Sequence, residues 1–242
     1  MLINNTIENL KLLRMPAMAD GLKHQIEDPN YGSLSFEDRI SMLVDQEIVT
    51  RQSNRMERNI KSAQLKMPAS VEDIDFSSTR QLNKAQILTL AESNWIKSFQ
   101  NLIITGPTGL GKTYLACALS NAALRHNYSV KFHRFTKLTD EMTVSRVDGR
   151  WISLMNALVK VDLLILDDFL IKALNTEQAS NILELIEDRA QKSTIFASQL
   201  PIDRWHDAIG DPTLADAILD RILAKSTRIE LMGPSMRNDQ RR

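Results

Sequence analysis

Residues 106–113 constrain the fold of this chain more than any other segment, with the sequence Gly-Pro-Thr-Gly-Leu-Gly-Lys-Thr. They match the pattern GxxxxGK(S/T), in which glycines let the backbone turn tightly so that successive N–H groups surround phosphate oxygens. The aliphatic run 101–105 before them is predicted to be a strand. Residues 112 to about 126 are predicted to be a helix whose N-terminus attracts the same anion. The segment therefore predicts nucleotide binding, because a chance glycine loop would lack these flanking elements.

Two side chains of this loop have specific roles in the predicted chemistry. Lys112 is expected to reach the β- and γ-phosphates of ATP, and the hydroxyl of Thr113 to ligate Mg²⁺. ATP and Mg²⁺ are therefore the expected cofactors. The residues expected to contact the nucleotide are Gly106, Pro107, Thr108, Gly109, Leu110, Gly111, Lys112, Thr113 and Tyr114.

An aliphatic run at 163–166 predicts a buried strand that delivers Asp167 and Asp168 at its carboxyl end. In open α/β sheets, ligands bind at this end of the strands. Asp167 is expected to hold Mg²⁺, directly or through water, and Asp168 to orient and deprotonate the attacking water. A single aspartate here would commonly be a solvated turn residue. An adjacent pair downstream of a phosphate loop predicts nucleoside triphosphate hydrolysis.

A polar residue also ends the run 194–198, which is predicted to be a third strand. Ser198 and Gln199 are both candidates to sense the γ-phosphate or to position the water. We expect Gln199 to have this role and count it among the catalytic residues. Its position alone is equally compatible with an ordinary turn residue.

Short apolar runs alternate with helical patterns through the later part of the chain, which is typical of a parallel sheet covered by helices on both faces. The predicted fold class is α/β, a P-loop NTPase with a five-stranded parallel sheet. Apolar residues at helical spacing indicate instead an all-helical region from Leu2 to about Lys66, with a turn at 28–32. The predicted domains are a helical domain at 1–67, a linker at 68–79 and an ATPase domain at 80–242. The predicted strands are 101–105, 130–135, 163–167, 194–198 and 227–231.

The composition restricts the cellular compartment and the kinds of partner expected for such a chain. A single cysteine, Cys117, excludes an internal disulfide framework and fits a reducing compartment. The sequence shows neither a secretory signal nor the roughly 18 uninterrupted apolar residues that span a bilayer, so a cytoplasmic location without a membrane partner is expected. Thirty basic residues balance thirty acidic ones, which taken as a whole counts against a nucleic-acid partner.

Two further stretches, VDLLILDDF and GDPTLADAILDR, are more specific than the phosphate loop, and the closing stretch RIELMGPSMR adds to them. With them, nearly the whole chain resembles the IstB-like helper ATPases of insertion sequences, in the DnaA/DnaC branch of AAA+ ATPases. The resemblance implies a P-loop domain of AAA+ type preceded by a small helical domain for DNA contact, partner contact and oligomerisation. The short stretch after the last predicted strand leaves little or no room for a C-terminal helical lid.

The resemblance also implies a role for Arg221, which matches an arginine that acts on the nucleotide of the neighbouring subunit. Such an arginine neutralises charge developing on the transferred phosphoryl group. Without the resemblance, a structural ion pair with Asp216 or Asp220 would be the better explanation of Arg221. A site completed by a neighbour implies a homo-oligomeric ring or spiral. The family implies that it forms on double-stranded DNA and presents this DNA to a partner transposase.

The sequence departs from the family pattern in the turn after the acidic pair. Relatives tend to have glycine where this chain has Leu170, so the shape of that turn is expected to differ. Asp168 stands where most AAA+ enzymes have glutamate, and its shorter side chain predicts slow ATP hydrolysis. Arg237 is a further candidate sensor of the nucleotide state.

Charge is distributed unevenly along the chain, which reopens the question of a DNA partner. Residues 51–66 carry five basic residues against one acidic residue, and residues 125–150 carry six against three. Positions 51, 55 and 58 share one face of a helix. Solvated helix faces often carry such charge, but with the family resemblance we interpret both tracts as sequence-tolerant phosphate contacts. The candidate DNA-binding residues are Arg51, Arg55, Arg58, Lys61, Arg134, Lys137, Arg146 and Arg150.

Two other functions are compatible with the phosphate loop. A DnaC-like helicase loader would use the same ATPase domain, with its N-terminal helices docked on a replicative helicase. A small-molecule kinase would need a phosphate-acceptor pocket and a basic lid within one subunit, and it gives no role to an arginine from a neighbour. The match around residues 196–221 favours the transposition helper.

Overall fold

The computed structural model of the protein describes residues 2–76, 82–233 and 235–236. The chain divides into two compact units, Met1–Arg58 and Asn59–Arg242. The helix α3 (Phe36–Ala63) begins in the first unit and ends in the second. None of the helices among the described residues is long and apolar enough to cross a membrane.

The N-terminal unit consists of helices, as its periodicity predicts. Helix α1 (Leu2–Leu12) is followed by α2 (Pro16–Glu27), the short 3-10 helix η1 (Pro29–Ser33), and the long α3. The start of α3 is fixed by Ser35, whose hydroxyl accepts a hydrogen bond from the backbone N–H of Asp38 at 3.1 Å. The predicted turn at 28–32 corresponds to η1, which the Asp28 carboxylate caps by accepting from the N–H of Asn30.

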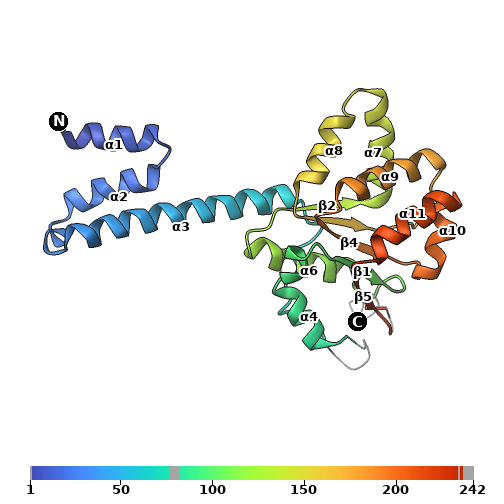
Figure 1. Ribbon diagram of the computed structural model, residues 1–242. Helices are drawn as coiled ribbons and strands as arrows, with labels where there is room; N and C mark the ends of the chain where they lie inside the picture. Colours follow the sequence, from blue (N-terminus) through green and yellow to red (C-terminus); the bar gives the residue numbers. More distant parts are fainter. Residues whose placement is uncertain (1, 77–81, 234, 237–242) are drawn as a thin grey trace. The chain divides into compact units, whose positions relative to one another are not determined.

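The second unit contains the predicted parallel sheet (Figure 1). The order of its strands is β2-β3-β4-β1-β5. Every neighbouring pair of strands is parallel, so the prediction of a five-stranded parallel sheet is confirmed. The second strand ends one residue before its predicted end because Phe135 already begins a helix. The strands are β1 (Asn101–Thr105), β2 (Val130–Arg134), β3 (Leu163–Asp167), β4 (Ser193–Ser198) and β5 (Ser226–Glu230).

Helices cover both faces of this sheet, because successive side chains of a strand point to opposite faces. Leu102 and Ile104 of β1 pack with α6 (Lys112–Arg125) and α4 (Lys84–Ala91) in what we call the α6-side core. Ile103 packs on the other face, in the α9-side core. That core is built with the helices α7 (Phe135–Val147), α8 (Trp151–Lys160), α9 (Thr176–Asp188), α10 (Trp205–Ile209) and α11 (Pro212–Leu223). The short elements α5 (Asn94–Lys97) and η3 (Ile202–Arg204) complete the unit.

The segment expected to be a linker packs on the sheet unit where it is described. Ala69, Val71 and Ile74 are buried in the α6-side core. Burial of these apolar side chains holds the described part of the segment against the sheet unit. The compact units divide after Arg58, earlier than the boundary expected after residue 67. The start of the ATPase domain expected at residue 80 lies outside the described residues.

Candidate nucleotide-binding site

The phosphate loop and the acidic pair meet at the carboxyl edge of the sheet. In the parallel register Thr105 of β1 pairs with Ser198 of β4, and Asp167 of β3 pairs with Ala197 of β4. The loop after β1 therefore lies across β4 from the acidic pair after β3. This is the edge at which open α/β sheets bind ligands.

The glycines of the loop are required by its backbone conformation and by its close packing. Gly106, Gly109 and Gly111 have φ values of 143°, 88° and 86°, in a region that side chains disfavour. A β-carbon on Gly106 would lie 2.4 Å from the carbonyl oxygen of Leu231, and one on Gly109 would lie 2.1 Å from the hydroxyl of Ser235. The loop can therefore turn tightly around an anion only with these glycines in place.

Lys112 lies inside the loop that precedes it. Its ammonium donates to the carbonyl oxygens of Gly106 at 2.6 Å and Pro107 at 2.8 Å, and the residue is buried. Helix α6 begins at Lys112, directly after Gly111 in a left-handed conformation. A phosphate group bound at the first amides of α6 would meet this ammonium, as the sequence predicts.

Thr113 and Asp167 place two oxygen atoms that could ligate a metal ion close together. The Thr113 hydroxyl donates to Asp167 Oδ1 at 2.8 Å, and the Asp167 side chain is only 2% exposed. The described residues contain no cluster of three or more His, Cys, Asp or Glu that could hold a metal ion. A hydroxyl and one carboxylate nevertheless fit Mg²⁺ beside a nucleotide, which commonly uses one or two protein carboxylates together with phosphate oxygens. The second oxygen of Asp167 receives the ammonium of Lys66 at 3.0 Å, a contact that the sequence did not predict.

Asp168 is held differently from its neighbour. Its Oδ2 accepts from Arg134 Nε at 3.0 Å, and its Oδ1 accepts from Gln199 Nε2 at 3.3 Å. Its φ is 57°, a left-handed backbone conformation that is uncommon for residues other than glycine and that clusters at functional sites. The carboxylate is thus oriented from two sides, by the ends of β2 and β4.

Gln199 connects the loop to the acidic pair. Its Oε1 accepts a hydrogen bond from the Thr108 hydroxyl at 2.5 Å, while its amide group donates to Asp168. Ser198, the other candidate, is buried and donates to the carbonyl oxygen of Phe169 at 2.8 Å. The geometry therefore brings Gln199 to the site and gives Ser198 a contact with the turn after β3.

Leu170 is the residue at which the resemblance led us to expect a glycine. Its φ is 55°, and its side chain is fully buried in the α9-side core. Glycine adopts this conformation without steric cost, so the backbone at this position is one that favours glycine. The turn itself is closed by a hydrogen bond of 3.2 Å from the N–H of Ile171 to the carbonyl oxygen of Asp168.

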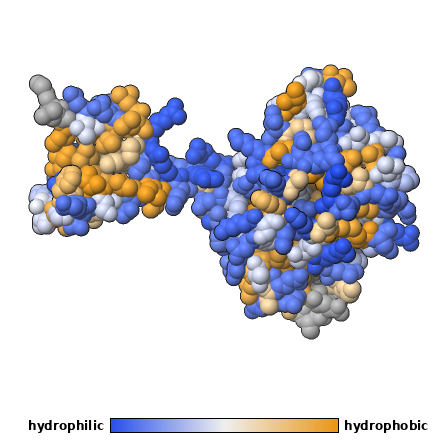
Figure 2. All heavy atoms as spheres, viewed as in Figure 1, coloured by the Kyte–Doolittle hydropathy of each residue, from blue (hydrophilic) through white to orange (hydrophobic). Residues whose placement is uncertain are grey.

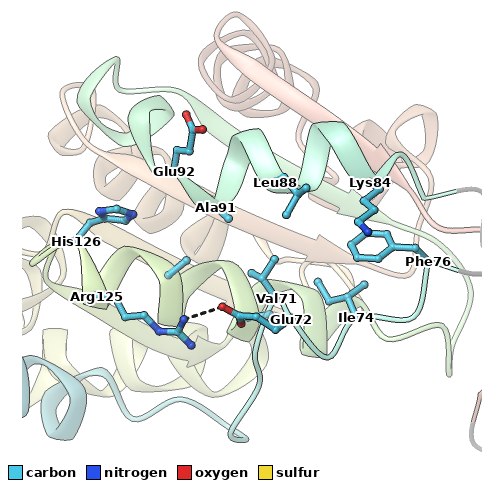
Figure 3. A pocket seen from close by; sticks show the side chains of 12 residues that line it. Val71, Glu72, Ile74, Phe76, Lys84, Leu88, Ala91, Glu92, Arg125 and His126 are labelled. Atoms are coloured by element: carbon cyan, nitrogen blue, oxygen red, sulfur yellow. Dashed lines mark hydrogen bonds and ion pairs between the residues drawn. The ribbon is translucent and has the colours of Figure 1, made fainter.

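Tyr114 points away from the loop, and a separate pocket lies further along α6. The Tyr114 hydroxyl lies 3.4 Å from both the backbone N and O of Ser70, so any nucleotide contact of this residue involves its backbone. The pocket has a volume of about 540 Å³, and no residue of the phosphate loop lines it. Figure 3 shows the ion pair between Arg125 and Glu72 in this pocket. Because α6 rises about 1.5 Å per residue, Arg125 lies roughly 18 Å beyond Thr113 along the helix axis.

Arg221 lies on α11 and is paired on the surface. Its guanidinium contacts Glu187 of α9 at 2.7 Å, and the side chain is 41% exposed. It pairs with neither Asp216 nor Asp220, the partners that its spacing suggested. Arg237 lies outside the described residues, and those described after β5 form no helix.

Half of the candidate DNA-binding residues are engaged in ion pairs. Arg134 contacts Asp168, Arg146 contacts Glu184 at 2.6 Å, and its guanidinium lies 3.6 Å from the centre of the Trp151 ring. Arg51 pairs with Glu47, and Arg150 with Asp148. The other candidates are exposed and form no ion pair with the described part of the chain: Arg55, Arg58, Lys61 and Lys137.

Comparisons with known proteins identify the family of this chain. The model of the family described as IstB-like ATP binding protein matches residues 8–242. The insertion sequence ATP-binding protein y4pL of Sinorhizobium fredii (strain NBRC 101917 / NGR234) is 38% identical over 243 residues, which cover 100% of this chain and 99% of that relative. The insertion sequence IS1162 ATP-binding protein of Pseudomonas fluorescens is 41% identical over 203 residues, covering 83% of this chain and 88% of that relative.

Solved structures share the fold at lower sequence identity. The crystal structure of DnaI superposes with a TM-score of 0.59 and 23% identity, covering 69% of this chain and 96% of that one. AMPPCP-bound DnaA from Aquifex aeolicus has a TM-score of 0.58 and 21% identity, covering 70% of this chain and 51% of that one. The chain therefore belongs to the IstB-like ATP-binding protein family, and its fold is that of the DnaA/DnaC group of AAA+ proteins.

Proposed function

We propose that this protein is an ATP-dependent, DNA-binding transposition helper. It assembles on target DNA, hydrolyses ATP at the interfaces between its subunits, and presents the DNA to a partner transposase. The observation that carries the ATPase part is the position of Asp168, which Gln199 and Arg134 orient next to the Thr113–Asp167 pair. Family membership and the insertion-sequence relatives support the transposition part.

Nucleotide binding follows from the loop. The backbone amides of residues 106–113 and the ammonium of Lys112 take the phosphate oxygens of ATP. Thr113 and Asp167 would hold Mg²⁺, which neutralises phosphate charge when bound. Because Asp167 is almost entirely buried, its carboxylate presents a fixed oxygen at this position.

Hydrolysis of ATP is assigned to Asp168, acting as the general base. Asp168 accepts a proton from a water molecule whose oxygen attacks the γ-phosphorus, and the bond from that phosphorus to the bridging oxygen of ADP breaks. Gln199, fixed between Thr108 and Asp168, orients the water or the γ-phosphate. The products are ADP and inorganic phosphate, and the proton on Asp168 returns to solvent.

Arg221 supplies the part of the site that one subunit lacks. Its guanidinium is partly exposed on α11 and held only by a surface ion pair with Glu187, so a neighbouring nucleotide can compete for it. A head-to-tail contact that delivers this arginine repeats from subunit to subunit and gives a ring or a spiral. Hydrolysis then depends on assembly.

DNA contact is assigned to the exposed basic residues of α3. Arg55 and Arg58 lie three residues apart on one helix and form no ion pair within the described chain. Such side chains neutralise DNA phosphates without reading the bases, which suits a helper that accepts many targets. Exposed apolar side chains of the N-terminal unit, among them Leu12, Leu13 and Phe36, support protein contacts there (Figure 2).

A DnaC-like helicase loader remains the second candidate function. The observation that favours it is the fold shared with DnaI and with the DnaC helicase loader, which has a TM-score of 0.55 and 19% identity and covers 67% of this chain and 96% of that one. The insertion-sequence relatives, which match over nearly the full length, favour the transposition helper.

The test measures ATP hydrolysis and partner capture with the same preparation. We expect the wild-type protein to hydrolyse ATP with Mg²⁺ and duplex DNA, and to retain a transposase of the insertion-sequence type in a pull-down. Retention of a replicative helicase without the transposase would instead support the loader. Absence of any DNA-stimulated hydrolysis would contradict both.

A further inference from the structure

Lys66 reaches the nucleotide site from the segment that follows helix α3. Its ammonium lies 3.0 Å from Asp167 Oδ2, across 101 residues of sequence. The lysine side chain is 46% exposed, whereas the Asp167 side chain is 2% exposed. Lys66 is thus the solvent-side cation of a buried carboxylate whose other oxygen is taken by Thr113.

The backbone on both sides of Lys66 is anchored to the second unit. Lys131 donates to the carbonyl oxygen of Ser62 at 3.2 Å and to Gln64 Oε1 at 2.9 Å. On the other side, the Asn121 side chain donates to the carbonyl oxygen of Ala69 at 2.5 Å. Because these anchors leave only a short stretch between them, the direction of the Lys66 side chain is set by the fold.

We propose that Lys66 is a positioning residue that competes with Mg²⁺ for Asp167 and so sets the Mg²⁺ concentration at which nucleotide binds. The inference rests on the proposed role of Asp167 as the metal ligand. A Mg²⁺ ion binds oxygen at about 2.1 Å, and an ammonium hydrogen-bonded to the same carboxylate opposes its approach by direct charge repulsion. Binding of the metal therefore requires that Lys66 give up its ion pair.

Two opposite effects follow from this competition. With the ammonium removed, the metal meets an unpaired buried carboxylate, so Mg²⁺ binds more tightly. Without metal, the same unpaired carboxylate repels the phosphates of the nucleotide, so metal-free nucleotide binds more weakly. A lysine that only anchored its segment would weaken both kinds of binding together.

The experiment is a Mg²⁺ titration of nucleotide binding to the full-length protein, with a fluorescent methylanthraniloyl ADP as the probe. For Lys66→Met we expect the Mg²⁺ midpoint to fall about fivefold, which corresponds to the loss of one partly exposed ion pair. In EDTA, the affinity of this variant for the same probe falls below that of the wild type. Lys66→Gln is the second neutral variant, with the same expected directions.

Two controls isolate the charge at Asp167. Lys66→Arg keeps the cation, and its midpoint should stay within about twofold of the wild type. Lys97→Met removes an exposed cation of the second unit that forms no ion pair within the described part of the chain, and should also leave the midpoint within about twofold. A midpoint that is unchanged or raised in both neutral variants overturns the competition. A wild-type protein without Mg²⁺-dependent nucleotide binding would instead contradict the proposed function itself.

Discussion

Charged side chains are arranged differently at the carboxyl edge of the sheet and on helix α3. At the edge, Asp167 and Asp168 each have fixed partners from distant parts of the chain. On α3, Arg55 and Arg58 are exposed and form no ion pair among the described residues. Fixed pairs give the defined geometry that a reaction needs, whereas hydrated cations suit a uniformly charged partner such as DNA.

The largest effect should come from the carboxylate at the edge. Asp168→Asn keeps the size of the side chain but removes the proton acceptor, so the ATP turnover rate should fall about 10²- to 10⁴-fold. Nucleotide affinity should stay within about threefold, because the loop is untouched. Steady-state hydrolysis and fluorescent ADP binding measure the two quantities. Normal turnover in Asp168→Asn would show that the oriented carboxylate at the edge is not the base.

The phosphate loop, at the same edge of the sheet, should determine the affinity for nucleotide. Lys112→Ala removes an ammonium that lies inside the loop, and nucleotide affinity should fall about 100-fold through the loss of charged hydrogen bonds. Lys131→Ala is the matched control, because this lysine contacts residues 62 and 64 and not the loop. Equal nucleotide affinities of the two variants would show that Lys112 contributes no more to nucleotide binding than a lysine outside the loop.

The basic residues of α3 should affect DNA and leave the fold unchanged. Changing Arg55 and Arg58 together to glutamate should weaken duplex DNA binding about tenfold. The slope of the logarithm of the binding constant against the logarithm of the salt concentration should become shallower by about two. Binding measured by fluorescence anisotropy across a salt series tests both values. Lys97→Glu with Lys172→Glu makes the same charge change on exposed residues of the second unit and should have a smaller effect.

Arg146 provides the contrasting case within the second basic tract. Arg146→Glu breaks an ion pair with Glu184 and a cation–π contact with Trp151, so it should lower the melting temperature. We expect little change in the salt dependence of DNA binding by the folded variant. A large change in the salt dependence of DNA binding, without loss of stability, would show that Arg146 contacts DNA as the α3 arginines do.

The smallest effect is the difference in stability between two substitutions of Leu170, in the turn after the acidic pair. Leu170→Ala loses a buried side chain, with an expected cost of about 2–5 kcal/mol of unfolding free energy. Leu170→Gly loses slightly more apolar surface but relieves the left-handed φ, so it should be about 1 kcal/mol more stable than Leu170→Ala. Denaturant unfolding gives the order of the two variants. Alanine more stable than glycine would show that the backbone there is not strained.

The sheet and the loop could be predicted from the sequence because both depend on local patterns. Aliphatic runs such as 163–166 and the spacing of glycines in 106–111 specify strand and loop without reference to distant residues. The position of Gln199 beside Asp168 could be predicted in the same way, since it required only that two parallel strands end side by side.

The partners of the carboxylates could not be predicted in this way. Lys66 and Arg134 were counted as parts of two basic tracts, but the fold brings them to Asp167 and Asp168, across 101 and 34 residues of sequence. Charge alone does not specify a partner, because its choice depends on how the strands and the segment after α3 are packed. The burial of Ala69, Val71 and Ile74 was missed for the same reason.

The most direct test of the account mixes two inactive variants on duplex DNA. Arg221→Ala keeps its own Asp168, and Asp168→Asn keeps the arginine that it offers to a neighbour. If sites form between subunits, an equal mixture should recover about a quarter of wild-type ATP hydrolysis, since about that share of random interfaces combines both intact residues. A mixture no more active than the sum of its two components would contradict a site completed by a neighbouring subunit.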